Sequence, residues 1–144
     1  MLRDRNLIPL SHEHQHALGM CVLVQRALAQ DASAENLARQ RALILEKWNG
    51  EIRAHFLLEE TVLFPALAAF PGAAPLVDEL VAEHAAMRGL MEELEAGADR
   101  GVMERLCEAL SAHVRKEERG LFERAQQWMS REELDALGER LRMT

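Results

Sequence analysis

The chain carries one motif twice, in which a glutamate follows a histidine by four residues. Both copies read H-x-x-x-E-E-x-x-L-F, and they begin at His55 and His113. A spacing of four residues places two side chains on one face of a helix, about one turn apart. Glu59 and Glu117 therefore share a helix face with a histidine. Imidazole and carboxylate groups gathered on one face favour a metal site with mixed nitrogen and oxygen ligands.

A shorter repeat, Glu-His, occurs at Glu13-His14 and again at Glu83-His84. On a helical wheel of about 100° per residue, each of these histidines lies on the apolar face of its own helix, as His55 and His113 do. Four expected helices thus each turn one histidine toward the core. The chain reads as two helical hairpins built to one plan, which predicts two similar ligand sets around one centre.

Two carboxylates that face an apolar interior are costly unless positive charge compensates them. A pair of metal ions provides that charge. We predict that two ions are bound, with both glutamates as bridges and the histidines as terminal ligands: His14, His55, Glu59, His84, His113 and Glu117. Mixed nitrogen and oxygen ligands suit iron, and ligand type alone leaves zinc and manganese open. Glu118 is a rival to Glu117.

Several polar residues beside these positions have two interpretations each. His12 and His16 lie opposite His14 on the wheel and are expected to face solvent or a partner, with an accessory metal site as the alternative. Arg88 lies one turn from His84, and it either pairs with an acid or attracts an anionic ligand. Glu60 is expected to be solvated or paired. Glu13 and Glu83 are surface acids, or else they orient the imidazoles. Cys21 and Cys107 are expected to fill the core as free thiols.

The elements that must position these residues are helices, since Leu, Ala, Glu, Arg and Met dominate the composition. Capping residues and Pro65, which is expected to end or kink the second helix, give the boundaries. We expect four long helices and a short fifth one that opens with a capping box: 11–30, 33–64, 75–95, 99–129 and 130–142. The fold class is therefore all-α, an up-and-down four-helix bundle in a single domain of residues 1–144 with its core at 10–128.

The composition excludes several classes of protein. The 144 residues carry a formal net charge of −7, and no basic patch favours nucleic acid or an anionic membrane. No apolar run approaches the roughly 20 residues that span a bilayer. The first six residues lack the apolar stretch of a signal peptide. A cytoplasmic protein is the expectation.

These residues resemble the hemerythrin-like proteins with the HHE cation-binding domain. The resemblance covers roughly residues 10–128 and is most specific at HFLLEETVLFP (55–65) and HVRKEERGLF (113–122), with PLSHEHQHAL (9–18) similar to the start of bacterial members. It implies a four-helix bundle around an oxo- or hydroxo-bridged di-iron centre. The family's ligand positions match the same six residues that the helical wheel selects.

The chain departs from the oxygen-carrying members in two ways. Those members have a fifth histidine from an H-x-x-x-H pair on the third helix, where this chain has Leu80 and Arg88 around His84. They also place the last carboxylate as Asp five residues after its histidine, where this chain has Glu118. Four histidines leave more coordination positions to water or an added ligand, which favours small-molecule binding or redox chemistry over simple oxygen carriage.

The leading hypothesis is a non-haem di-iron protein that binds or senses oxygen, nitric oxide or peroxide, or that handles iron. A peroxidase- or oxidase-like enzyme is the second hypothesis, and the lack of Tyr and of a free acid or base beyond the ligands argues against it. The third is an interaction module with a structural metal, in which the outer face of the first helix binds a protein partner or a second copy.

Overall fold

Four long helical rods and one short helix make up residues 2–144, which are the residues described by this computed structural model. The first, third and last are α1 (Ile8–Gln30), α5 (Ala74–Ala96) and α8 (Arg131–Arg142). The second and fourth rods are each interrupted by π-helical turns: α2 (Ala34–Lys47), η1 (Trp48–Ile52), α3 (Arg53–Leu58), η2 (Glu59–Leu63) and α4 (Phe64–Ala68), then α6 (Arg100–Lys116), η3 (Glu117–Leu121) and α7 (Phe122–Trp128). No strand occurs within residues 2–144. The predicted all-α class and the C-terminal helix after the bundle are confirmed.

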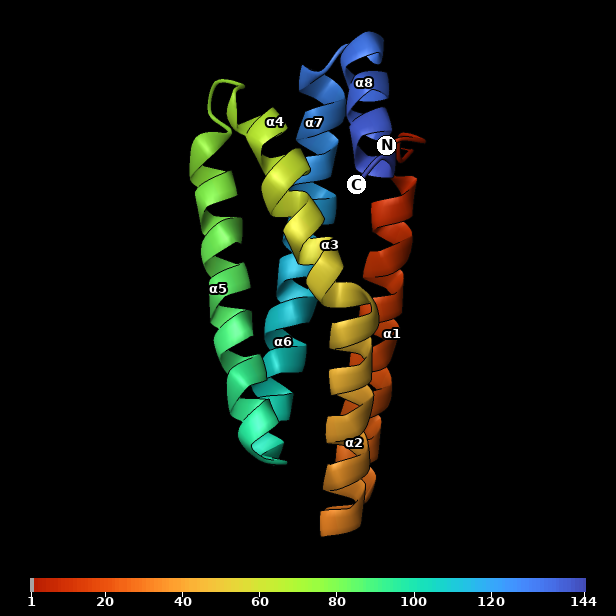
Figure 1. Cartoon of the computed structure of the whole chain (residues 1–144), viewed down its shortest axis with the longest axis vertical. Helices are drawn as coiled ribbons and strands as arrows, with labels where there is room; N and C mark the ends of the chain where they lie inside the picture. The colour runs from red at the N-terminus through yellow and green to blue at the C-terminus, as the bar shows by residue number, and fades with distance from the viewer. Residues whose placement is uncertain (1) are drawn as a thin grey trace.

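The second rod bends and crosses the face of the bundle (Figure 1). Its first part, α2, lies beside α1, and its last part, α4, reaches α5. The fourth rod, α6 to α7, runs behind it and packs along both α1 and α5. Short connections join successive rods, so neighbours run in opposite directions, as the up-and-down topology requires.

The spacing of apolar residues explains where the second rod widens into π turns. Ile44, Trp48, Ile52 and Phe56 are all buried and lie four residues apart. In a regular α-helix each four-residue step overshoots a full turn by about 40°, so this series would drift off the buried face. A π turn holds more residues per turn and absorbs the drift. A π turn also occurs in the fourth rod, at η3.

Four of the five predicted helix starts agree with the structure to within one residue, including that of α5 at Ala74. The Ser33 and Asp99 side chains accept backbone hydrogen bonds at the starts of α2 and α6, and Ser130 and Glu133 form the capping box of α8. The prediction for Ser11 was wrong, because α1 begins three residues earlier at Ile8. Pro9 lies in its first turn, where a missing N–H costs nothing. Residues 8–10, predicted to be irregular, are helical.

Pro65 does not end the second rod, so the predicted helix end at residue 64 was wrong. It lies in the first turn of α4, and the helix continues to Ala68. Directly before it, the N–H of Phe64 bonds to the carbonyl of Glu59, five residues back, at the end of η2. A proline ring clashes with the carbonyl of an ordinary α-helical turn. The wider π turn relieves that clash, so the helix passes through the proline.

Two apolar clusters make up the core, one on each side of the middle of the bundle. One surrounds Met20, Trp48, Met91 and Leu106 at the α2 end, and the other surrounds Phe64, Leu80 and Phe122 at the α8 end. The thiols of Cys21 and Cys107 are buried in the first cluster, as predicted. A layer of buried polar side chains separates the clusters.

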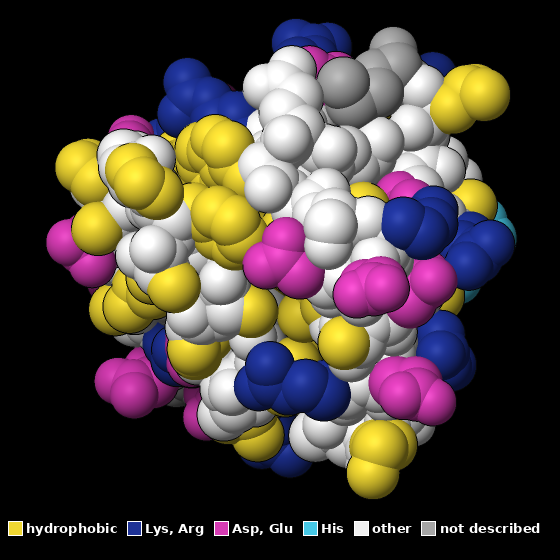
Figure 2. Space-filling model, turned by 90° about the horizontal axis from the view of Figure 1, so that it is seen from above, with side chains coloured by type: hydrophobic (Ala, Val, Ile, Leu, Met, Phe, Trp, Pro, Cys, Tyr) yellow, Lys and Arg dark blue, Asp and Glu magenta, His cyan; other side chains and the backbone are white. Residues whose placement is uncertain are grey.

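The short helix α8 closes the upper end of the bundle beside the N-terminal arm (Figure 1). Leu134 and Leu137 are buried there, and the amide of buried Asn6 donates to Asp135 at 2.8 Å. A Cβ at Gly138 would overlap Asn6, so the close approach requires glycine. Figure 2 views this end and shows acidic and basic side chains interspersed, with hydrophobic side chains grouped at one side. In the described residues, no helix is long and apolar enough to cross a membrane.

Candidate metal centre

All six residues selected from the sequence meet in the polar layer between the two apolar clusters. Each is at most 5% exposed, although each is polar or ionisable. They form two groups of four that share both glutamates: His14 and His55 with Glu59 and Glu117, and His84 and His113 with the same pair. The structure therefore supplies two candidate ion positions that share two carboxylates.

The histidines of each group face each other through their Nε2 atoms. The Nε2 atoms of His14 and His55 are 3.0 Å apart, and those of His84 and His113 are also 3.0 Å apart. Two atoms that bind one ion at about 2.1 Å and roughly at a right angle lie about 3.0 Å apart. The two pairs thus have the separation of neighbouring ligands on a single ion.

Glu59 reaches both histidine pairs. Its Oε2 lies 3.3 Å from Nε2 of His55, and its Oε1 lies 3.2 Å from Nε2 of His84. The two oxygens of this carboxylate thus lie beside different ion positions. Glu117 approaches both pairs through Oε2, at 2.7 Å from Nε2 of His113 and 3.7 Å from Nε2 of His14. This arrangement suits two ions held side by side.

The carboxylate oxygens of Glu59 and Glu117 are the feature that a metal-free bundle does not explain. All four oxygens are buried, and none accepts a hydrogen bond, despite the short approach of His113 to Glu117. A buried carboxylate without partners costs several kcal/mol, roughly, and nearly all buried polar groups in folded proteins are satisfied. Cations at the two positions would satisfy all four oxygens, so this donor set fits a pair of metal ions.

The second nitrogen of every histidine is held by an acid from a neighbouring rod. Each Nδ1 donates to one carboxylate, and the four hydrogen bonds are His14 to Glu118 at 2.5 Å, His55 to Glu13 at 2.8 Å, His84 to Glu60 at 2.7 Å and His113 to Glu83 at 2.8 Å. Each acid precedes or follows a predicted ligand in the sequence. The bonds run from rod to rod and close a ring around the bundle. In a neutral imidazole, such a bond fixes the tautomer and leaves Nε2 with its lone pair for an ion.

The structure resolves the alternatives that the sequence left open for these acids. Glu118 is not in the inner layer, because both its oxygens accept from the Ser11 hydroxyl and one also accepts from His14. Glu13, Glu60 and Glu83 orient imidazoles. Arg88 donates both terminal amino groups to the carboxylate of Glu60, at 2.8 and 2.9 Å. It supports this outer acid and has no direct contact with the inner glutamates.

The metal-free layer is electrically asymmetric. Burial lowers the pKa of His14, but the nearby carboxylates of Glu117 and Glu59 and the hydrogen bond to Glu118 outweigh burial and raise that pKa to about 10. At the pseudo-equivalent position, burial and the neighbouring His113 lower the pKa of His84 to about 4. At neutral pH the layer therefore holds a proton at His14 and a neutral imidazole at His84.

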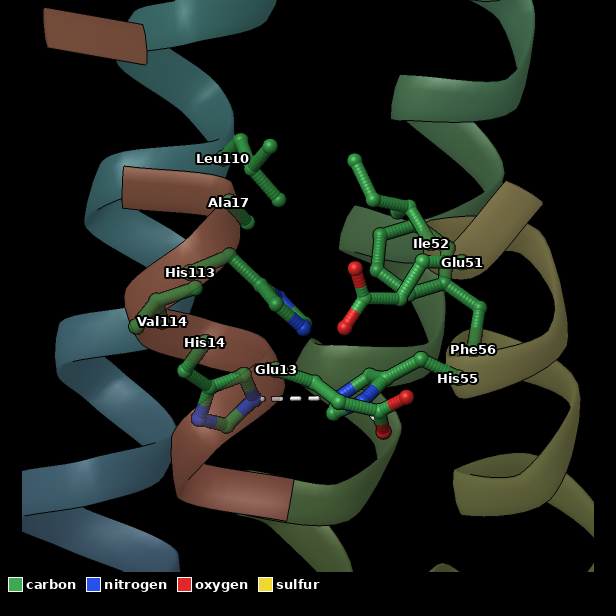
Figure 3. A pocket seen from close by; sticks show the side chains of 10 residues that line it. All are labelled: Glu13, His14, Ala17, Glu51, Ile52, His55, Phe56, Leu110, His113 and Val114. Atoms are coloured by element: carbon green, nitrogen blue, oxygen red, sulfur yellow. Dashed lines mark hydrogen bonds and ion pairs between the residues drawn. The ribbon is translucent and has the colours of Figure 1, made fainter. Parts of the chain in front are cut away.

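A small pocket borders the layer between α1, η1, α3 and α6 (Figure 3). Its walls include three of the inner histidines, apolar side chains such as Ile52 and Leu110, and two acids, Glu13 and Glu51. The space is on the order of one water molecule, which suits a small ligand. The sequence analysis did not select Glu51. The signal was present, because Glu51 precedes His55 by four residues, just as Glu59 follows it by four.

Aromatic rings pack on the histidines from both apolar clusters. Phe56 stacks on His84 with ring centroids 3.8 Å apart, and Phe122 stacks on His14 at 5.5 Å. Farther out, the side chains of Trp48, Val62 and Leu106 are each at most 8% exposed. Such packing limits rotation of the imidazoles and keeps bulk water from the layer.

Comparison with known proteins agrees with this geometry. The model of one protein family, described as the hemerythrin HHE cation binding domain, matches residues 9–125, most of the chain. All six inner residues and all four outer acids lie within the matched range. Searches of curated proteins and of solved structures give no significant match.

Proposed function

The chain belongs to the hemerythrin HHE cation-binding family, and on that premise we propose that it holds two iron ions and binds or senses a small ligand there. Each ion would take two histidines, and Glu59 and Glu117 would bridge the ions. The observation that carries the proposal is the set of four buried carboxylate oxygens without hydrogen-bond partners. Four protein ligands per ion leave positions open in an octahedral coordination sphere.

An iron pair supplies an open coordination position for oxygen, nitric oxide or peroxide. The chain's own residues determine what reaches that position. The pocket beside His14, His55 and His113 has room for a ligand of about the size of water. Phe56 and the apolar wall residues exclude larger molecules. A small diatomic ligand or peroxide is therefore the ligand class we propose. We also propose a cytoplasmic location.

The test is metal content combined with an ultraviolet-visible spectrum before and after azide. We expect about two irons per chain, with near-ultraviolet bands that shift when azide binds. Two irons without an azide response would favour a structural metal or iron handling instead. No stoichiometric metal after anaerobic reconstitution with ferrous iron would contradict the proposal.

Removing an outer acid should weaken metal binding without removing an inner ligand. In Glu60→Gln, the amide replaces the carboxylate that orients His84 through Nδ1. Loss of such a partner lowers metal affinity by roughly 10–100-fold. Competition with a coloured chelator measures the change. Glu123→Gln on α7 removes the same charge outside the ring and should leave the affinity unchanged. An unaltered affinity in Glu60→Gln would show that the outer ring does not support the ions.

Metal loading at pH 7 should release at least one proton, the one held at His14. The pKa of His14 in the metal-free layer is about 10, so its imidazole is protonated at pH 7 and must lose that proton to bind an ion. Metal affinity should therefore fall as pH is lowered below about 10. His84, with a pKa of about 4, adds no proton at pH 7. Titration calorimetry in buffers of different ionisation enthalpy counts the protons, and a count of zero would contradict this assignment.

A further inference from the structure

The four outer acids of the ring are covered unequally at the surface. Three of them have a Lys or Arg partner: Glu60 has Arg88, Glu83 has Lys116, and Glu118 has Arg3, with 3.3 Å between Arg3 Nη2 and Glu118 Oε1. Glu13 has no Lys or Arg partner within residues 2–144, and its described contact is with His55. The ring thus has four corners, one at each outer acid. At three of them the acid is paired with a Lys or Arg, and at the corner of Glu13 it is not.

The pocket beside the inner layer lies at this fourth corner. Figure 3 shows the side chains of Glu13 and Glu51 on the same side of the pocket, opposite His113 and beside His55. The side chain of Glu13 is 34% exposed and that of Glu51 is 23% exposed, so both reach from solvent toward the interior. The pocket therefore lies at the corner where the outer acid has no Lys or Arg partner.

Glu51 is paired with a histidine outside the ring. Its Oε1 lies 2.9 Å from Nδ1 of His16, whose side chain is 59% exposed. The two groups form a hydrogen bond, so an imidazole nitrogen and a carboxylate oxygen, both possible cation ligands, lie side by side. Lys47 lies on the same rod at 3.7 Å from Oε2 of Glu51, an exposed pairing of the kind that contributes little. Glu51 thus faces the pocket with one side and an exposed imidazole with the other.

We propose that this opening, bounded by Glu13 and Glu51, is the route by which divalent cations reach the buried centre, and that Glu51 and His16 are the transient ligands that capture them. The proposal rests on the proposed function, since it requires a centre that takes up ions. Acids that line a narrow opening concentrate cations there. The cations at Arg88, Lys116 and Arg3 repel an approaching ion from the other three corners.

The capture pair is suited to transfer and not to storage. Two protein ligands, with water completing the coordination sphere, bind an ion far more weakly than the four that converge on each inner position. From Glu51 the ion passes Glu13, whose carboxylate already holds Nδ1 of His55. His55 then presents its Nε2 to the inner position. The number of protein ligands increases from the surface to the inner position, so the affinity for the ion increases in the same direction.

The test is the rate at which the metal-free protein takes up cobalt(II), followed by visible absorbance after rapid mixing. In Glu51→Gln the side chain keeps its shape and loses its charge, so we expect uptake to slow by about 10-fold at low ionic strength. His16→Gln should slow uptake as well. Glu51→Lys, which reverses the charge at this position, should slow it further. Glu93→Gln on the exposed face of α5 removes one charge elsewhere and should load at the wild-type rate.

The final cobalt content separates the possible outcomes. Slow uptake to the wild-type content in the Glu51 variants supports the access route. Uptake at the wild-type rate in both Glu51→Gln and Glu51→Lys would overturn it. A lower final content in Glu51→Gln would overturn it too, because Glu51 would then be a ligand of the centre itself. If the wild-type protein takes up no metal, the proposed function fails and the access route fails with it.

Discussion

Loading with two ferrous ions under anaerobic conditions is expected to raise the thermal unfolding midpoint by roughly 10–15 °C. A ligand present at a thousand times its dissociation constant stabilises the native state by about 4 kcal/mol, and a domain of this size gains a few degrees per kcal/mol. The ions bind only the folded chain, because the ligands come from four separate rods. Scanning calorimetry of the metal-free and loaded protein measures the shift.

Glu59→Gln is the matched control for this result. Glu59 is the one inner residue that lies within about 3.3 Å of both histidine pairs, so its loss affects both ion positions. We expect the variant to unfold at the same temperature with and without ferrous iron. A shift as large as that of the wild-type protein would show that the stabilising ions bind elsewhere.

Replacing both inner glutamates with methionine should abolish metal binding and make the metal-free protein more stable. Burial and the neighbouring Glu117 raise the pKa of Glu59, which reports the cost of placing two carboxylates in this layer. Apolar side chains of similar volume in place of buried charges are often stabilising by about 1–4 kcal/mol. Urea unfolding of the metal-free Glu59→Met, Glu117→Met protein measures the gain. Glu118 remains to compensate the charge on His14.

This second prediction separates a binding site from a structural one. A site kept for metal sacrifices stability of the metal-free chain, so removing its charges restores that stability. A marked loss of stability in the double variant would mean instead that the carboxylates hold the bundle together without metal. The single variant Glu117→Met is a useful intermediate, because it removes one of the two like charges and should give part of the gain.

The sequence determined the helical class and the inner layer of the site. Histidines and glutamates at four-residue spacing on apolar faces can be recognised from the chain alone, because helix geometry fixes which side chains share a face. The same geometry failed at the boundaries. Ser11 and Pro65 were given their usual roles at helix ends, but α1 starts earlier at Ile8 and η2 allows the helix to continue through Pro65.

The outer ring was decided by the tertiary structure. Each of its hydrogen bonds joins two different rods, so sequence spacing within a helix says nothing about it. Glu118 illustrates the point. Beside Glu117 in the sequence, it was a rival for the role of inner ligand, but in the folded bundle it accepts hydrogen bonds from Ser11 and His14. The uneven covering of the outer acids and the pocket at Glu13 and Glu51 likewise depend on how rods pack.

What the sequence by itself determined is therefore the set of groups that each helix turns inward, since that follows from a local periodicity of about 3.6 residues per turn. What only the tertiary structure decided is how those groups meet. The 3.0 Å separations of the histidine pairs and the unsatisfied oxygens of Glu59 and Glu117 arise between rods. Distances between helices depend on the packing of whole apolar faces, and no short stretch of sequence contains that information.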